Sequence, residues 1–219
     1  MTTRSSELTQ EETRDPKNWT NRLRGWFESL VPKGEALPAT QPVYVASWIY
    51  IFGVLTLTSL VVVIASGCVL SLGGVAWWHV SSLGHFFNSI HLWSVELFFG
   101  FMVVHLWGKF WMAAWRGKRA LTWITGVVLF VISIGTSFTG FLSQSNFSAQ
   151  WIGGEGKDGI NSIGVGAFFN VLNPGQMLLW HVVLLPLGVG LLTLWHIILV
   201  RRRGVVPPLD ADSPVEKEA

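Results

Sequence analysis

Four long apolar stretches set the pattern of this chain, and most of its charged residues lie before the first stretch or after the last one. Residues 36–95, 120–154 and 159–200 contain no Asp, Glu, Lys or Arg. About 20 apolar residues in an α-helix cross the ~30 Å hydrocarbon core of a membrane, and a helix satisfies its backbone polar groups without water. The pattern predicts an all-α membrane protein with four transmembrane helices, which cover roughly residues 46–70, 87–111, 121–142 and 177–200.

The segment before the first of these helices has an amphipathic pattern. It reads NWTNRLRGWFESLV, with apolar residues at helical spacing and two arginines between them: Trp19, Leu23, Trp26, Phe27 and Leu30, with Arg22 and Arg24. This pattern is typical of a helix that lies on the membrane surface, either as a plain anchor or with a role of its own.

The chain therefore divides into four parts. We expect a polar N-terminal tail (1–17), an amphipathic surface helix with its linker (18–45), the four-helix bundle (46–203) and a polar C-terminal tail (204–219). The connection between the third and fourth transmembrane helices contains GGEGKDGINSIGVG, whose many glycines predict an irregular loop.

Composition and charge placement add an orientation. Only 13% of the residues are charged, about half of the roughly 25% of a soluble domain. Fourteen of the fifteen Lys and Arg residues precede the first helix, join the second to the third, or follow the fourth, and Lys157 is the exception. The positive-inside rule then places both termini in the cytoplasm, as in a multi-pass protein of the plasma membrane. The first 17 residues lack the apolar core of a signal peptide.

Four histidines in two of the apolar stretches give the clearest chemical signal. His91 and His105 lie fourteen residues apart in the second helix, and His181 and His196 lie fifteen apart in the fourth. Either spacing is about four helical turns, roughly 21–22 Å, and leaves each pair broadly on one helix face. Because these two helices run in the same direction, the histidines form two levels, His91 with His181 toward the outside and His105 with His196 toward the cytoplasm.

Imidazole is a common axial ligand of haem iron. One histidine from each of two helices fills both axial positions, which favours electron transfer because no position stays open for oxygen. A lone histidine in a membrane helix is more often a hydrogen-bonded core residue, but two matched pairs predict two b-type haems. The chain has no C-x-x-C-H motif for covalent attachment.

Glycines in the other two helices repeat the same spacing. Gly53 and Gly67 lie fourteen residues apart in the first helix, and Gly126 and Gly140 lie fourteen apart in the third. Glycine permits the close approach of a bulky partner, although it is also common where membrane helices pack together. The shared spacing favours the first interpretation, in which the four glycines make room for the haems.

These residues resemble the cytochrome b/b6 family, specifically its N-terminal four-helix dihaem half. The resemblance covers roughly residues 26–209. It rests on the four histidines, the four glycines and the stretches LTWITGVV, TGF and WHIILVRRRGVVPPL. The fifteen-residue spacing in the fourth helix is similar to the b6 branch, in which cytochrome b is split into two chains.

The resemblance implies a function and a set of partners. An outer low-potential haem would be held by His91 and His181, and an inner high-potential haem by His105 and His196. Electrons would pass from an outer quinol site to an inner quinone site within a lipid bilayer. The expected partners are a Rieske iron–sulfur protein, a subunit resembling the C-terminal half of cytochrome b, a c-type cytochrome and a second copy in a homodimer. The chain would not be a complete enzyme alone, and nothing in it suggests nucleic-acid binding.

Departures from the family pattern keep a second function open. The arginine that the family has after the first histidine is Leu92 here, and its Pro-Trp-Asp sequence reads Gln144–Asn146. The P-E-W-Y motif of quinol oxidation is absent from this sequence. The alternative is a dihaem membrane anchor that links the quinone pool to a peripheral dehydrogenase or reductase.

Further haem ligands are not expected. In b6 proteins a cysteine near the start of the first helix holds a third haem, but Ile51 stands at about that position. The single cysteine, Cys68, lies near the opposite end and also excludes an intrachain disulfide. His79 and His85 lie near the outer loop and are expected to be surface or interface residues rather than ligands.

Several charged residues within or beside the helices each have two possible roles. Glu96 lies inside the second helix, where a carboxyl group is costly and usually functional; it either relays protons or is a protonated group bonded to a backbone carbonyl. Arg119 and Arg201 are candidates to neutralise the inner haem propionates, and Lys109 could do the same or hold a quinone. Their alternative role is to set topology, and Arg201, five residues after His196, is the best propionate candidate.

Overall fold

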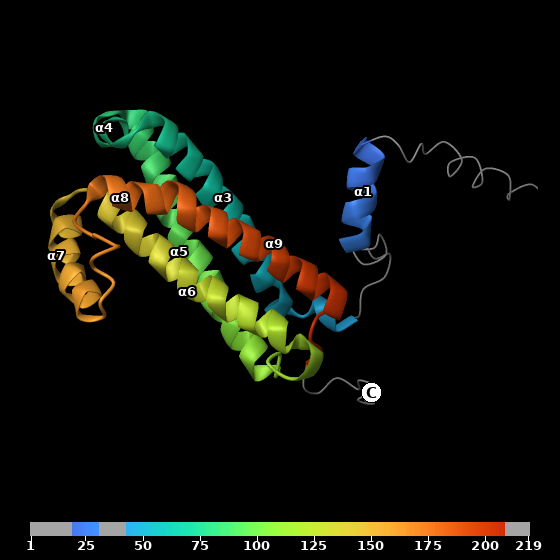
Figure 1. The fold of residues 1–219 in the computed structure, drawn as a ribbon. Helices are drawn as coiled ribbons and strands as arrows, with labels where there is room; N and C mark the ends of the chain where they lie inside the picture. The colour runs from blue at the N-terminus through green and yellow to red at the C-terminus, as the bar shows by residue number, and fades with distance from the viewer. Residues whose placement is uncertain (1–18, 31–42, 209–219) are drawn as a thin grey trace, which may run out of the picture.

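The computed structural model describes residues 19–30 and 43–208, and these residues form helices and no strands (Figure 1). The α-helices are α1 (Trp19–Leu30), α3 (Ile51–Gly73), α4 (Val75–Val80), α5 (Ser82–Trp111), α6 (Ala120–Ser143), α7 (Phe147–Ser162), α8 (Pro174–Leu179) and α9 (Leu185–Arg203). Short 3₁₀ turns are η1 (Val43–Ala46), η2 (Trp48–Tyr50) and η3 (Gly117–Arg119), and η4 (Trp180–Leu184) is a π-helical turn.

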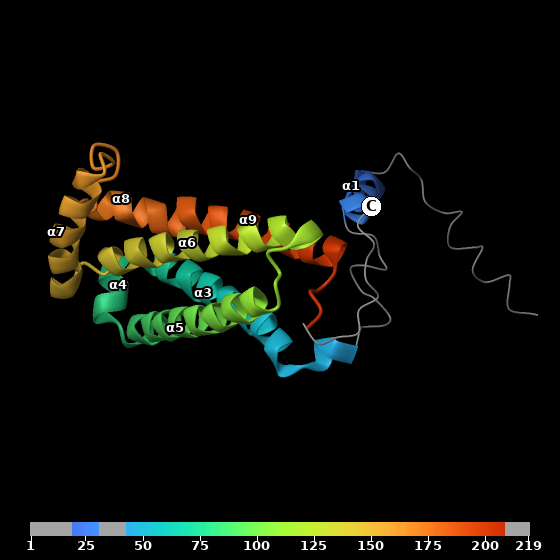
Figure 2. The same ribbon diagram turned by 90° about the horizontal axis from the view of Figure 1, so that it is seen from below.

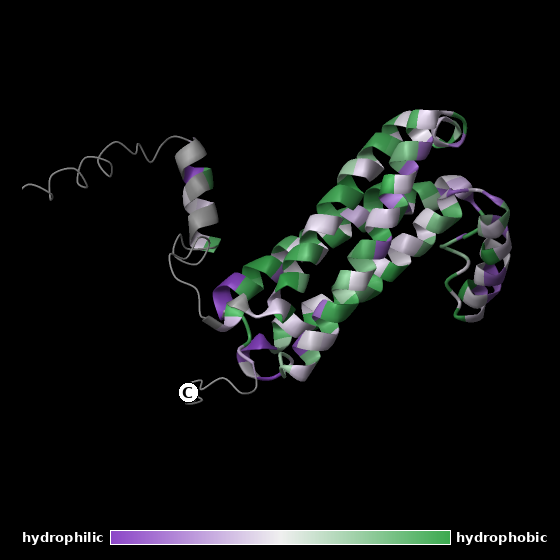
Figure 3. Cartoon of the chain, turned by 180° about the vertical axis from the view of Figure 1, so that it is seen from behind, coloured by the Kyte–Doolittle hydropathy of each residue, from purple (hydrophilic) through white to green (hydrophobic). Residues whose placement is uncertain are grey.

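Four helical spans are long and apolar enough to cross a membrane, as the sequence predicts. They are Trp48–Gly73, Ser82–Trp111, Gly117–Ser143 and Pro174–Arg203, with mean hydropathies from 1.4 to 2.3. The last span joins α8, η4 and α9 into one continuous rod. Figure 3 shows apolar residues along the rods and polar ones concentrated near their ends. The described chain is therefore an all-α, multi-pass membrane bundle.

The two ends of the bundle differ in character. At one end lie η3, the last turn of α9 with Arg201–Arg203, and the surface helix α1; we call this the basic end (Figure 1). At the other end, the α7 end, α4 and α7 close the loops, and Figure 2 shows α7 running across the ends of α6 and α8. Helices α5 and α9 both run from the α7 end to the basic end, as the arrangement into two histidine levels requires.

The bundle is built from two helix pairs. Helix α3 packs along α5, and α6 packs along α9. A central cluster joins the pairs through Leu60 of α3, Phe98 and Met102 of α5, and Val189 of α9. This apolar centre lies between the two histidine levels and separates them.

The glycine-rich segment after the third membrane helix, residues 153–166, is helical up to Ser162, so the prediction of a loop is wrong there and holds only for residues 163–166. Residues Phe147–Ser162 form α7, which begins where the Asn146 side chain accepts a hydrogen bond from the Ala149 backbone N–H at 2.8 Å. Ala149 is 2% exposed, and Gly153 packs against Leu142 and Leu172. A cap and a buried face thus outweigh the low helix propensity of glycine.

Both flanking segments attach to the basic end. The prediction of a helix in residues 18–31 is confirmed by α1, whose last carbonyls at Ser29 and Leu30 accept hydrogen bonds from the Arg202 guanidinium at 3.0 and 2.5 Å. Residues 204–208 pack on the bundle rather than forming a tail: Val206 is buried and its carbonyl accepts from the Tyr50 hydroxyl at 2.7 Å. The predicted tails at 1–17 and 209–219 lie outside the described residues.

Candidate haem-binding site

Each of the four histidines faces one of the four predicted glycines on the neighbouring helix of its pair. A Cβ atom added to Gly67 would lie 3.1 Å from the His91 ring, and one added to Gly53 would lie 3.0 Å from His105. On the other pair, a Cβ on Gly126 would lie 3.2 Å from the ring of His196.

The fourth contact is tighter still. A Cβ on Gly140 would come closer to the His181 ring than side chains ever approach each other. The glycines therefore make room first for the histidine rings themselves, which is a more direct role than the space for a haem that their spacing predicts.

The glycines also leave a backbone carbonyl open to the ring. His91 Nδ1 donates to the Val63 carbonyl at 3.0 Å, and His181 Nδ1 donates to the Thr136 carbonyl at 2.8 Å. In each case the carbonyl belongs to the residue four positions before the glycine. Among the described residues, the hydrogen bonds of these rings are made by Nδ1 and none by Nε2. The rings are thus held with Nε2 available as a ligand.

A hydroxyl residue precedes three of the four glycines and joins this arrangement. The Thr125 hydroxyl donates to the Thr122 carbonyl at 2.8 Å and accepts from His196 Nδ1 at 2.9 Å. Ser66 bonds the Val63 carbonyl at 3.1 Å and lies 3.0 Å from His91 Nδ1.

The third hydroxyl is that of Thr139, which is 1% exposed and donates to the Thr136 carbonyl that accepts from His181. Our sequence reasoning missed these three side chains, although a Ser-Gly or Thr-Gly pair repeated in two helices was a signal that could have found them.

The fourth position breaks the pattern. Phe52 precedes Gly53, so this site has no hydroxyl, and His105 Nδ1 is buried without a hydrogen-bond partner among the described residues. Phe52 instead packs against Phe101 of α5, with ring centroids 6.1 Å apart. His105 is therefore the least constrained of the four imidazoles.

The donor set fits a haem. At the α7 end, the rings of His91 and His181 face each other from different helix pairs with centroids 6.0 Å apart, which leaves room for a metal bound to one nitrogen of each ring at roughly 2.0 Å. In the described residues no three His, Cys, Asp or Glu side chains converge, so this part of the chain offers a metal at these pairs two histidine ligands and leaves its other positions for a cofactor to fill. A porphyrin supplies four.

A π-helical turn explains the unequal spacings. The turn η4 holds His181 and is followed by Pro186, which lacks a backbone N–H and disfavours the regular α-helical bond at that place. A π turn bonds residue i to i+5 and so contains one residue more than an α-helical turn. Fifteen residues across η4 therefore align His181 and His196 as fourteen α-helical residues align His91 and His105.

The predicted basic residues gather at the basic end, with different surroundings. The Lys109 ammonium lies 3.7 Å from the centre of the Tyr50 ring, and the Arg119 guanidinium bonds the Gly204 carbonyl at 3.5 Å. Arg201 is exposed on the last turn of α9 and makes no hydrogen bond among the described residues. These residues lie near the level of His105 and His196, where they could bind haem propionates. Of the three, only Arg201 has no hydrogen bond or cation–π contact with another described residue.

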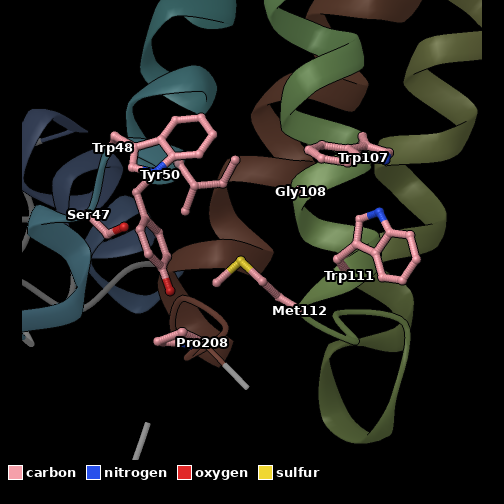
Figure 4. A pocket seen from close by; sticks show the side chains of 9 residues that line it. Ser47, Trp48, Tyr50, Trp107, Gly108, Trp111, Met112 and Pro208 are labelled. Atoms are coloured by element: carbon pink, nitrogen blue, oxygen red, sulfur yellow. The ribbon is translucent and has the colours of Figure 1, made fainter. Parts of the chain in front are cut away.

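A pocket of about 340 Å³ opens beside Tyr50 at the same end (Figure 4). Its lining is mostly aromatic and apolar, and includes Trp48, Trp107, Trp111, Met112 and Pro208. Such a lining suits a flat apolar ring or a lipid chain.

The residues of the α7 end serve to hold segments together. The Gln144 backbone carbonyl accepts from His79 Nε2 at 2.9 Å, and the Gln144 side chain bonds Asn88 at 3.1 Å. His85 Nε2 donates to the His79 carbonyl at 2.9 Å. His79 thus joins α4 to the end of α6, and His85 joins the start of α5 to α4; both side chains are exposed, as expected for surface or interface residues.

The sequence matches a family model described as "Cytochrome b(N-terminal)/b6/petB" over residues 96–219, which include His105, His181 and His196. It is 31% identical over 140 residues to the cytochrome bc complex cytochrome b subunit of Chlorobaculum thiosulfatiphilum, covering 58% of this chain and 32% of that protein. It is 26% identical over 187 residues to the menaquinol:cytochrome c reductase cytochrome b subunit of Geobacillus thermodenitrificans, covering 75% and 84%. Cytochrome b6 of Heliobacterium modesticaldum is 27% identical over 138 residues, with 58% and 64% covered.

The fold has a solved counterpart. A chain of the "Hyperthermophilic respiratory Complex III" superposes with a TM-score of 0.70 at 19% identity, over 97% of this chain and 58% of that one. The present chain thus spans about a third of the Chlorobaculum subunit and little more than half of the structural counterpart. The family match covers more than half of the chain and includes three of the four facing histidines, and the protein accordingly belongs to the cytochrome b N-terminal/b6 family.

Proposed function

We propose that this chain carries electrons across the membrane through two b haems, as the b6-like cytochrome b subunit of a quinol-oxidising bc-type complex. The main observation in support is that each of the four histidine rings packs against a glycine of the neighbouring helix. In three cases the ring is also fixed by a hydrogen bond from Nδ1. A purely structural histidine has no need of a neighbouring helix shaped to its ring. The relatives named above are cytochrome b subunits, which supports the same function.

In this proposal His91 and His181 hold one haem, and His105 and His196 hold the other. Haem supplies a one-electron couple whose potential depends on its axial ligands and their hydrogen bonds. The chain's own residues set that environment. The Nδ1 bonds fix the ring orientation and raise the basicity of Nε2, while Leu60, Phe98, Met102 and Val189 keep the space between the levels apolar.

The remaining assignments follow from the same proposal. The basic end faces the cytoplasm of a plasma membrane because of its arginines and lysines, and Arg201 and Arg119 neutralise propionates of the nearer haem. Quinone, a Rieske protein, a c-type cytochrome, a C-terminal-half subunit and a second copy complete the complex. Neither Ile51 nor Cys68 attaches a third haem.

The test is a haem count with ligand variants. We expect a pyridine haemochrome spectrum of the purified chain to give two b haems per polypeptide, and His→Ala at any of the four positions to remove one. His79→Ala and His85→Ala are matched controls that should keep both. The proposal would be refuted by a full-length chain that binds no haem although haem was supplied during its preparation.

A dihaem anchor for a peripheral dehydrogenase or reductase is the second candidate, and one observation favours it. Gln144 and Asn146, which replace the family's Pro-Trp-Asp sequence, are engaged in bonding Asn88 and capping α7. Purification of the native complex distinguishes the two: a Rieske protein supports the first function, and a peripheral dehydrogenase or reductase without one supports the second.

A further inference from the structure

Glu96 is an acidic residue at the centre of a membrane-spanning helix and has no basic partner among the described residues. It lies fourteen residues after the start of α5 at Ser82 and fifteen before its end at Trp111. Its side chain is exposed on the outside of the bundle, and it makes no hydrogen bond or ion pair with the described residues. Among the described residues, Glu96 thus has neither a second group that could relay a proton nor a carbonyl that accepts a hydrogen bond from it, as the two interpretations from the sequence require.

A carboxyl group in this position requires a complement. Ionisable side chains at the middle of a membrane helix face a bundle interior or a water-filled cavity and pair with another polar group. Glu96 faces away from the interior of this bundle, because Phe98 and Met102 of the same helix are the residues that point into the central cluster. The complement therefore comes from outside the part of the chain that the structure describes.

The surface around Glu96 is shaped for another helix. At about 100° per residue, Trp93, Gly100, Val103 and Trp107 lie within about 60° of Glu96 around the axis of α5. All four are exposed, and the three with side chains are 71%, 49% and 58% exposed. A Cβ on Gly100 would meet nothing within 4 Å. A small residue between larger ones lets a second membrane helix approach closely, and here it does so one turn from Glu96.

A second copy of this chain does not supply the complement. Two copies in one membrane, related by an axis along the membrane normal, keep equal residues at equal depth, so Glu96 would face another carboxyl group. The nearest cation along α5 is Lys109, thirteen residues and roughly 20 Å away, and Arg119 and Arg201–Arg203 lie at the same basic end. Among the described residues, the chain offers no positive charge at mid-membrane.

We infer that the α5 face made by Trp93, Glu96, Gly100, Val103 and Trp107 docks a transmembrane helix of a different polypeptide, and that this helix presents Lys, Arg or His to Glu96 at mid-membrane. The inference concerns the assembly of the chain and does not depend on the haem assignment.

The experiment places a photo-crosslinking amino acid at Val103 of the full chain, expressed in its native membranes, and identifies the adduct by mass spectrometry. The expected product is a peptide from an apolar segment of another protein, with Lys, Arg or His within one turn of the depth of Glu96. A peptide from this same chain, an adduct with lipid alone, or a partner segment without a basic residue at that depth would each overturn the inference.

Charge variants test the pairing itself. Glu96→Lys is expected to lower the crosslink yield at least tenfold and Glu96→Gln severalfold, with the haem content per chain unchanged. Gly100→Leu should lower the yield as well, whereas Gly135→Leu, at a position on α6 with equally open space, should not. If Glu96→Lys fails to accumulate, Glu96→Gln decides the matter, and an unchanged yield in that variant contradicts the inference.

Discussion

The Thr125 hydroxyl lies 2.9 Å from Nδ1 of His196 and passes the hydrogen bond on to the Thr122 carbonyl, one helix away from the imidazole it holds. If His196 holds haem as proposed, the Thr125 side chain orients this ligand and increases its basicity. Loss of this contact should change the affinity of His196 for oxidised iron more than for reduced iron.

Thr125→Val is therefore expected to raise the potential of the basic-end haem by up to about 60 mV, since a net hydrogen bond is worth roughly 0.5–1.5 kcal/mol and 59 mV corresponds to about 1.4 kcal/mol in a one-electron couple. Potentiometric titration followed at the haem α-band measures it. Thr125→Ser should restore the original value. Thr58→Val, which removes a hydroxyl that bonds only its own helix, is the control; an equal shift there would contradict the assignment.

At His105 a hydrogen bond to Nδ1 can be added instead of removed. Phe52→Thr would place a hydroxyl before Gly53, as at the other three positions, and would give the buried Nδ1 a partner. We expect the potential of the basic-end haem to fall by up to about 60 mV on the same reasoning. Phe52→Ala, which removes the ring without adding a hydroxyl, should not lower it, and a fall of equal size in that variant would show that packing is responsible.

The distances between the glycines and the histidine rings predict how strongly each Gly→Ala substitution lowers the haem content. Gly140→Ala is expected to displace the His181 ring and reduce the haem content from two per chain toward one, because overpacking a filled site costs about 1–3 kcal/mol. Gly126→Ala, with a 3.2 Å contact, should retain more haem. Gly135→Ala lies on the same helix with open space and should retain both. Haemochrome assays of the three variants provide the comparison, and equal haem loss in all three would count against the ring contacts.

The π turn makes a prediction about chain length. Deletion of Val183 inside η4 would convert the turn to α-helix and leave His181 and His196 fourteen residues apart, so both haems should be retained. Deletion of Gly100 between His91 and His105 in α5 has no such turn to absorb it, and it rotates one ligand by about 100° relative to the other. We expect that variant to lose at least one haem by the same assay. Haem loss from the Val183 deletion alone would mean that the turn does not serve to align the ligands.

The sequence predicted the parts of this molecule that depend on period and length. The four spans, the helix α1 and the two levels of histidines all follow from hydrophobic periodicity and from a spacing of four turns. It did not predict α7, because the burial of Ala149 and Gly153 comes from tertiary contacts, which together with the local Asn146 cap outweigh a glycine-rich composition. The hydroxyl contacts were missed for a related reason: Ser66 and Thr125 reach across to another helix, and their partners are visible only once the helices are paired.

The pairing of each histidine with a glycine has a consequence for how the protein is assembled. Gly53 and Gly67 of α3 serve the histidines of α5, while Gly126 and Gly140 of α6 serve those on the rod of α8, η4 and α9. Each histidine thus finds its glycine within one helix pair, so that in the proposed function each half of a haem site would be complete before the two pairs meet. If these histidines hold haem as proposed, a newly inserted chain would prepare its ligands as two separate modules, and haem binding would add to the apolar cluster of Leu60, Phe98, Met102 and Val189 in joining them.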